Sequence, residues 1–253
     1  MHFINCYEND TRAAAYSKLE FANTYHLAFR DLPALFQKHV SGRVALDFGC
    51  GAGRSTRFLQ QLGFEVVGVD VSPQMLSKAR EIDPRGDYQL IPDDDMTGLP
   101  RGNFSLVLSA FTFDNIPGRE TKIRLFGDLR ALLRADGAIV NIVSSPDIYL
   151  YEWASFSTKQ FPENRHAKPG DPVKIVTTEL ADTSPAVDIL WPDESYRDVY
   201  ASADLRVADV LKPLATGDEP FAWINETQLA PWVIYVLKPG CRPVPATGGT
   251  EAV

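Results

Sequence analysis

The order of hydrophobic and polar positions predicts alternating strands and helices between residues 44 and 143. Short apolar runs alternate with stretches in which apolar residues recur at helical spacing. The runs are typical of buried strands, and the spacing is typical of helices that cover a sheet. The expected strands are 44–47, 64–70, 88–91, 104–109 and 138–143, and the expected helices are 54–62, 73–82 and 122–133. Strands connected through helices in this way run parallel.

The pattern changes on both sides of this region. Residues 11–39 carry apolar and aromatic side chains at helical spacing, with Pro33 at the start of a second helix. Residues 144–192 are rich in aromatic residues and prolines, and 173–180 can pair with 186–190 as an antiparallel hairpin. The regular alternation then resumes, with a helix expected at 195–203 and strands at 206–211 and 232–237.

These elements predict an α/β protein with a seven-stranded, mostly parallel sheet flanked by helices. We expect the core to span residues 41–238 and to carry an aromatic insertion at about 144–192, after the fifth strand. Residues 239–253 are rich in Pro, Gly, Thr and Ala, so we expect them to be a disordered tail.

Composition excludes several classes of partner. The chain has 253 residues and a net charge of −8, without a Lys/Arg cluster, which argues against nucleic-acid binding. Hydrophobic residues make up 45% of the sequence, as in ordinary globular proteins, and no apolar run is long enough to span a bilayer. We therefore expect neither a nucleic acid nor a membrane as partner.

The cysteines and histidines are too dispersed for a disulfide framework or a metal site. The three cysteines, Cys6, Cys50 and Cys241, have neither disulfide nor zinc spacing. The four histidines are not clustered with acids, so we expect no metal. Because the first ten residues also lack the pattern of a secretory signal, we expect a cytoplasmic protein.

The chemistry begins with glycines at alternate positions after the first strand. Gly49, Gly51 and Gly53 follow Asp47, and Asp70 ends the next strand. Glycine lets the backbone turn sharply out of a strand and approach a ligand closely. An acid about 20 residues further on is where a ribose is held in dinucleotide sites. The pattern indicates a ligand that contains a nucleoside, and a nicotinamide dinucleotide is one candidate.

The segment Asp47–Gly53 is similar to the acid-x-Gly-x-Gly-x-Gly signature of class I methyltransferases that depend on S-adenosylmethionine. Asp70 resembles the ribose-binding acid of that family, and the pair Asp95 and Met96 resembles its adenine-binding position. The resemblance covers about residues 44–143 and the final pair of strands. It implies a Rossmann-like fold and S-adenosylmethionine as cofactor, with S-adenosylhomocysteine as product.

The resemblance also implies which residues contact the cofactor. It makes residues 1–40 a helical lid, in which Arg30 could pair with the methionine carboxylate. Met75 and Met96 could enclose the adenine, since methionine is long and polarisable. The expected cofactor-binding residues are Tyr16, Arg30, Asp47, Gly49, Gly51, Gly53, Asp70, Val71, Met75, Asp95, Met96 and Ser109.

The acceptor side is expected beyond the fourth strand and in the insertion. Asp114 and His166 are candidate general bases, and each could instead be an ordinary loop residue. Aromatic and polar side chains in the same segments are candidates to contact the acceptor: Phe113, Asn115, Trp153 and Trp191.

We expect a methyltransferase that acts on N or O of a small, aromatic or heterocyclic molecule, as a monomer or homodimer. A nicotinamide-dependent oxidoreductase remains an alternative, although Arg54 stands where its usual third glycine would be. A non-catalytic sensor or scaffold that binds S-adenosylmethionine remains another.

Overall fold

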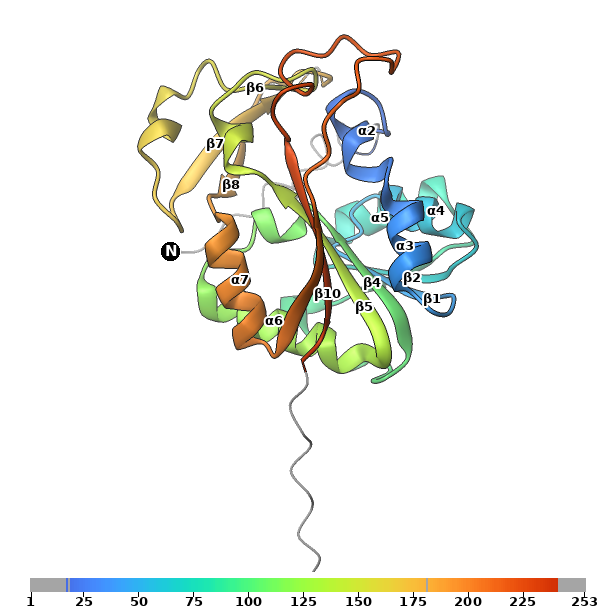
Figure 1. Cartoon of the computed structure of the whole chain (residues 1–253). Coiled ribbons are helices and arrows are strands. Elements are labelled where there is room, and N and C mark those ends of the chain that lie inside the picture. Colours follow the sequence, from blue (N-terminus) through green and yellow to red (C-terminus); the bar gives the residue numbers. More distant parts are fainter. Residues whose placement is uncertain (1–16, 18, 181, 241–253) are drawn as a thin grey trace, which may run out of the picture.

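The protein is built around one seven-stranded sheet with helices on both faces (Figure 1). The computed structural model describes residue 17, residues 19–180 and residues 182–240. The strand order is β3-β2-β1-β4-β5-β10-β9. Strands β1 to β5 are parallel, and β10 is antiparallel to both β5 and β9. The α/β class and the mostly parallel sheet are therefore confirmed.

The strands of this sheet lie close to the positions that the apolar runs predict. They are β1 Val44–Phe48, β2 Glu65–Asp70, β3 Asp87–Leu90, β4 Phe104–Ala110, β5 Leu133–Ser144, β9 Leu205–Leu211 and β10 Trp232–Pro239. The largest difference is at β5, which begins at Leu133 rather than at residue 138. Leu133 pairs with Phe104, and the register shifts beyond that pair. A Cβ at Gly137 would lie 2.9 Å from the Phe104 carbonyl oxygen, so glycine permits this irregular pairing.

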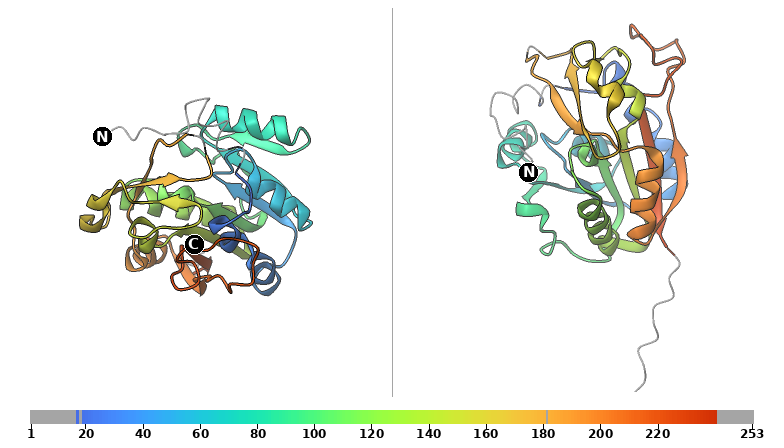
Figure 2. Two further views of the ribbon diagram at one scale, coloured as in Figure 1. Left: turned by 90° about the horizontal axis from the view of Figure 1, so that it is seen from above. Right: turned by 90° about the vertical axis from the view of Figure 1, so that its left-hand side faces the viewer.

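Helices cover the two faces of the sheet with separate apolar clusters. The described α-helices are α2 Thr24–Phe29, α3 Leu32–His39, α4 Arg54–Gln61, α5 Pro73–Ile82, α6 Arg119–Leu132 and α7 Asp193–Ser202. One face packs on α2, α3 and α4, and the opposite face packs on α6 and α7 (Figures 1 and 2). Short 3-10 helices lie in the connections: η1 Pro92–Asp94, η2 Thr112–Asp114, η3 Pro146–Tyr149 and η4 Pro162–His166.

The insertion after β5 forms a second, smaller sheet. Its strands are β6 Phe156–Ser157, β7 Pro172–Thr177 and β8 Ala186–Ile189, all antiparallel. The expected hairpin is confirmed, with Val173 opposite Asp188, and β6 adds a strand that the sequence pattern did not predict. In Figure 1 this sheet stands at the upper left, beyond the ends of the long strands. Residues 241–253 of the expected tail lie outside the described residues, and Pro239 still belongs to β10.

Within the residues that the structure describes, no helix combines the length and the apolar character that crossing a bilayer requires.

Phe126 on α6 holds one side of the core together. Its ring stacks on that of Phe113 at 4.0 Å between centroids and meets the ring of Tyr200 on α7 edge-on at 4.9 Å. All three side chains are buried. They therefore connect α6, α7 and the loop after β4 through two ring contacts that share Phe126.

We predict that Phe126→Ala lowers the free energy of unfolding by about 3–5 kcal/mol, because it leaves a cavity among rings that cannot collapse together. Urea denaturation measures the change. Ile224→Ala removes a side chain that is 56% exposed and should cost less than about 0.5 kcal/mol. Equal losses in the two variants would contradict this description of the core.

Candidate functional site

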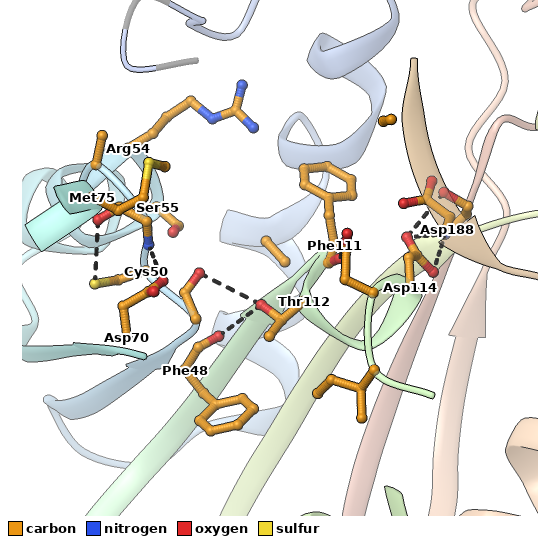
Figure 3. Close-up of a pocket in the computed structure, with 18 of the residues that line it drawn as sticks. Phe48, Cys50, Arg54, Ser55, Asp70, Met75, Phe111, Thr112, Asp114 and Asp188 are labelled. Carbon is orange, nitrogen blue, oxygen red and sulfur yellow. Dashed lines mark hydrogen bonds between the residues drawn. The ribbon is translucent and has the colours of Figure 1, made fainter. Parts of the chain in front are cut away.

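A cavity of about 600 Å³ lies at the carboxyl ends of the parallel strands. It opens where the strand order reverses, since β1 lies between β2 and β4. Open parallel sheets bind their ligands at such a reversal. Figure 3 shows one end of the cavity beside Asp70 and the other end beside Asp114 and Asp188, with Phe111 and Thr112 between them.

The turn after β1 has the backbone shape that its glycines allow. Gly49 and Gly51 have φ angles of +73° and +54°, in the left-handed region. A Cβ at Gly49 would lie 2.1 Å from Oγ1 of Thr112, and that hydroxyl donates a 3.1 Å hydrogen bond to the Phe48 carbonyl. The turn therefore packs against the loop after β4, and both glycines line the cavity.

Asp70 lies at the end of β2 and lines the same part of the cavity. Its carboxylate accepts hydrogen bonds of 2.8 Å from the backbone N–H groups of Gly51 and Ser72. Burial raises the pKa of Asp70, and these two N–H groups oppose the shift. Ser72 also caps α5, because its hydroxyl accepts from the Met75 N–H at 3.2 Å. The carboxylate is thus fixed by both neighbouring loops.

Asp47 is fully buried beneath the turn and does not line the cavity. Its Oδ2 accepts hydrogen bonds from the hydroxyls of Ser55 at 2.7 Å and Thr56 at 2.6 Å, both in the first turn of α4. Burial raises its pKa to about 6, and the two hydroxyls only partly oppose this. Asp47 therefore connects β1 to α4 and supports the glycine turn from below.

The acidic turn after β3 brings Asp93 and Asp94 to the cavity in place of the expected Asp95. Asp93 and Asp94 have φ angles of +52° and +58°, and this left-handed turn redirects the chain. Asp95 is exposed, and its carboxylate accepts from the Thr97 N–H at 2.9 Å. Met96 is buried in the core of the sheet. Of the acidic turn, Asp93 and Asp94 line the cavity, and the expected Asp95 and Met96 do not.

An aromatic wall separates the two acidic ends of the cavity. The rings of Tyr25 and Phe156 lie 5.2 Å apart, and those of Phe111 and Trp232 lie 4.6 Å apart. The guanidinium of Arg54, at the start of α4, lies 4.5 Å from the centre of the Tyr25 ring. These five side chains all line the cavity.

Asp114 and Asp188 form the second acidic end. Asp114 accepts from the N–H and the hydroxyl of Ser144, at 3.0 Å and 2.9 Å. Asp188 on β8 accepts from the Tyr149 hydroxyl at 3.0 Å. Burial, reinforced by the charge of Asp188, raises the pKa of Asp114 to about 7. A carboxyl group with such a pKa can take up or release a proton near neutral pH.

Several expected contact residues lie away from the cavity because other contacts hold them. The Arg30 guanidinium pairs with Asp31 and Glu219, each at 2.9 Å. Gly53 begins α4 and faces Tyr88. Ser109 is buried within β4. Tyr16 lies outside the described residues.

Of the residues expected to contact the acceptor, some line the main cavity and others lie away from it. Phe113 is stacked in the core, and the Trp153 indole is buried and donates to the Ile148 carbonyl at 3.0 Å. Trp191 lines a separate cavity. His166 is exposed, and Asn164 of the same 3-10 helix donates to the Lys174 carbonyl at 2.8 Å. Asn115, like Asp114, does line the main cavity, and so do Val71 and Met75 at its other end.

Sequence reasoning missed Asp188, Thr112 and Trp232, which all line the cavity. An acid within the otherwise apolar run Ala186–Ile189 was a usable signal for Asp188. Thr112 and Trp232 had no local signal, since their positions depend on pairing between distant strands. Within the described part of the chain, no group of three His, Cys, Asp or Glu side chains is placed to hold a metal ion.

Comparisons with known proteins identify the class of domain. Residues 46–141 match a family described as methyltransferase domain. Residues 46–141 form a methyltransferase domain. The 2-methyl-6-phytyl-1,4-hydroquinone methyltransferase of Synechocystis sp. is 29% identical over 131 residues, which are 51% of this chain and 37% of that protein. The ubiquinone biosynthesis O-methyltransferase of Nitrosococcus oceani is 27% identical over 135 residues, 50% of this chain and 56% of that protein. The chain thus spans about half or less of the length of these relatives.

Solved structures agree on the fold. A methyltransferase from Clostridium acetobutylicum that depends on S-adenosylmethionine matches with a TM-score of 0.61 at 14% identity, over 93% of this chain and 100% of that one. The CcbJ methyltransferase from Streptomyces caelestis matches with a TM-score of 0.59 at 16% identity, over 85% and 90%. The methyltransferase domain therefore has the Rossmann-like fold of class I methyltransferases.

The residues at the Asp70 end fit S-adenosylmethionine, the cofactor that this fold implies. A ribose needs hydrogen-bond acceptors, which the Asp70 carboxylate supplies. An adenine ring needs apolar surfaces, which Met75 and Ile91 supply. The left-handed Gly51 leaves room for close approach to the backbone.

We predict that Asp47→Asn changes how stability depends on pH. The folded protein holds the Asp47 proton more tightly than the unfolded chain, so wild-type stability falls as pH rises through the folded pKa of about 6. Between about pH 4 and pH 8 the wild type should lose roughly 2–3 kcal/mol relative to the variant.

Urea denaturation at several pH values measures this difference. Asp171→Asn changes an exposed carboxylate on the insertion and should leave the pH dependence like that of the wild type. If the Asp47→Asn and wild-type curves run parallel, the interpretation of Asp47 is wrong.

Proposed function

We propose that this chain transfers the methyl group of S-adenosylmethionine to a nitrogen or oxygen atom of a small aromatic or heterocyclic molecule. One observation carries the proposal: the cavity at the strand reversal joins a nucleoside-type end, at Asp70, to an aromatic and acidic end, at Asp114. A methyltransferase must hold donor and acceptor in one enclosed space so that their reacting atoms are aligned. We further propose a small molecule, rather than a nucleic acid, as the partner and the cytoplasm as the location.

The cofactor end is assigned from the contacts of its side chains. Asp70 would accept hydrogen bonds from the ribose hydroxyls, and the Gly51 backbone would lie against the same moiety. Asp94 would accept from the adenine amine, with Met75 and Ile91 against the faces of the ring. Arg54 stands in the cavity wall and would meet the methionine carboxylate, the role expected of Arg30.

The N-terminal helices would cover the bound cofactor. Tyr25 and Phe29 of α2 already form part of the cavity wall, and Ser17 and Leu19 before it line the same space. This placement supports the lid expected for residues 1–40.

The acceptor end supplies alignment and a proton acceptor. The sulfonium of the bound cofactor makes its methyl group electrophilic, so the protein need not activate the donor. The aromatic wall of Tyr25, Phe156 and Trp232 would hold a flat acceptor by its faces. Asp114 would accept the proton that the acceptor atom loses, since its pKa near 7 suits a general base.

The domain match and the lining of the cavity favour methyl transfer over an oxidoreductase or a sensor. A methyltransferase domain has no use for a nicotinamide, which disfavours hydride transfer. One relative is named for a hydroquinone, an aromatic acceptor that agrees with the aromatic wall here. A sensor that only binds the cofactor would have no need of a buried proton acceptor beside the aromatic wall.

We predict that Asp70→Asn weakens binding of S-adenosylhomocysteine by about 1–3 kcal/mol, because a charged acceptor for the ribose is lost. Isothermal calorimetry of wild type and variant measures the affinity. Asp87→Asn, an exposed change on the neighbouring strand β3, serves as the control and should bind normally. Titrations with NAD and NADP test the alternative, and preferential binding of either dinucleotide by the wild type would refute the proposal.

We predict that Asp114→Asn lowers methyl transfer by about 10²–10⁴-fold while binding of S-adenosylhomocysteine stays close to wild type. The assay follows label from S-adenosylmethionine into a panel of small phenols, amines and azaheterocycles, and into small molecules extracted from the source cells. Unchanged turnover in the variant would remove the role of Asp114. A wild type that binds the cofactor but labels nothing would favour the sensor.

A further inference from the structure

Two carboxylates from distant segments meet at the acceptor end of the cavity. Asp114 ends η2 after β4, and Asp188 lies on β8 of the insertion (Figure 3). Their exposed fractions are only 4% and 8%, yet both line the cavity. The domain core and the insertion each supply one acid, so the pair exists only when the insertion is docked on the sheet.

The contacts of Asp114 come from neutral donors. Ser144 donates twice, through its N–H at 3.0 Å and its hydroxyl at 2.9 Å, and the Tyr196 hydroxyl lies at 3.5 Å. Among the described residues no ion pair closer than 4.0 Å includes Asp114. A buried carboxylate held by neutral groups gains strongly from a cation that enters beside it.

The charge of Lys122 acts on Asp114, but the hydrogen bond of the lysine goes to another group. Lys122 is fully buried, and its ammonium donates to the Phe113 carbonyl. The rings of Trp191 and Tyr196 lie 5.3 Å and 5.4 Å from that ammonium. Lys122 does not line the cavity, so a ligand meets the carboxylates and not the lysine.

Apolar side chains of the insertion and of β10 line the same cavity as the two acids. Ile148, Phe156, Ile175 and Trp232 line the cavity near the insertion. A molecule that fills this space needs an apolar or aromatic body and, at one end, a group that can donate to two acids.

We propose that the methyl acceptor is a small molecule with an aromatic ring and a basic aliphatic amine. Its ammonium group is bound between Asp114 and Asp188. This inference rests on the proposed function, because it names the acceptor class of the same cavity. Three N–H donors of an ammonium can serve both carboxylates at once. The N–H bond can then break toward Asp114, which forms the O–H bond of a neutral acid and leaves the lone pair on nitrogen.

The pH dependence follows from every charged or titratable group around the pair. Asp114, whose pKa is raised by burial to about 7, loses charge as pH falls, and Lys122, whose pKa is lowered by burial to about 8, gains charge. Burial raises the pKa of each facing tyrosine well above its usual value, so they stay neutral: Tyr149, Tyr196 and Tyr200. The loss of negative charge at Asp114 and the gain of positive charge at Lys122 both weaken the binding of a cation as the solution becomes more acidic.

The first test uses the wild-type protein saturated with S-adenosylhomocysteine and two probes of matched shape, phenethylamine and 2-phenylethanol. Calorimetry should give about ten- to hundredfold tighter binding of the amine at neutral pH. That preference should shrink from about pH 8 to pH 6 for the reasons above. Equal affinities, no binding of the amine, or a preference that grows on acidification would each overturn the proposal.

The second test uses Asp188→Asn, with Asp171→Asn on the same insertion as the matched control. The first variant should lose most of the preference for the amine, and what remains should persist to lower pH, because removal of the Asp188 charge lowers the pKa of Asp114. The control should keep the wild-type preference and pH dependence. A wild-type preference in Asp188→Asn would refute the role of the pair.

The design separates the two proposals. If S-adenosylhomocysteine binds but the amine has no advantage, the acceptor class is wrong and the methyltransferase proposal stands. If S-adenosylhomocysteine does not bind the wild type, both fail. The wild-type probes require no variant to fold, so the proposal remains testable in either case.

Discussion

The reversal of strand order at β1 is the constraint on which the rest of the structure depends. With β2 on one side and β4 on the other, the connections that leave β1 and β4 diverge and leave a space above the sheet. Because the strands are parallel, their carboxyl ends all meet at that space. Gly49, Asp70 and Asp114 follow three different strands and still line one cavity. The order of the strands therefore determines which segments of the chain can line the cavity.

Two buried acids illustrate how similar burial serves different purposes. Asp47 and Asp114 both have raised pKa values because burial disfavours their charge. Asp47 accepts from two hydroxyls of α4 through its Oδ2 atom and is closed off from the cavity, so it connects β1 to α4 beneath the turn. Asp114 is bound by Ser144 on one side and lines the cavity on the other. Access to the cavity, and not the size of the pKa shift, separates the supporting acid from the candidate base.

Local patterns in the sequence predicted the parts of the site that depend on neighbouring residues. The glycine turn and Asp70 are close together in the sequence, and both lie at the ends of the strands where the pattern indicated. In the acidic turn, Asp93 and Asp94 line the cavity in place of Asp95, because left-handed φ angles at successive aspartates cannot be deduced from an acidic run. The places of the tryptophans, in the insertion and on β10, were the least predictable. Trp153 became core and Trp232 became cavity wall through tertiary packing alone.

Under the proposed function, the core forms the donor end of the cavity and the insertion completes the acceptor end. This difference explains why the sequence predicts the cofactor better than the methyl acceptor. The donor end is built from loops that directly follow β1, β2 and β3, and their geometry is set by the parallel sheet. The acceptor end requires β8 to dock against the loop after β4, so that Asp188 comes beside Asp114. A change in the insertion can thus replace one wall of the acceptor end without disturbing Gly51 or Asp70. Under the proposed function, acceptor specificity would reside in the insertion, which lies outside the regular alternation of strands and helices.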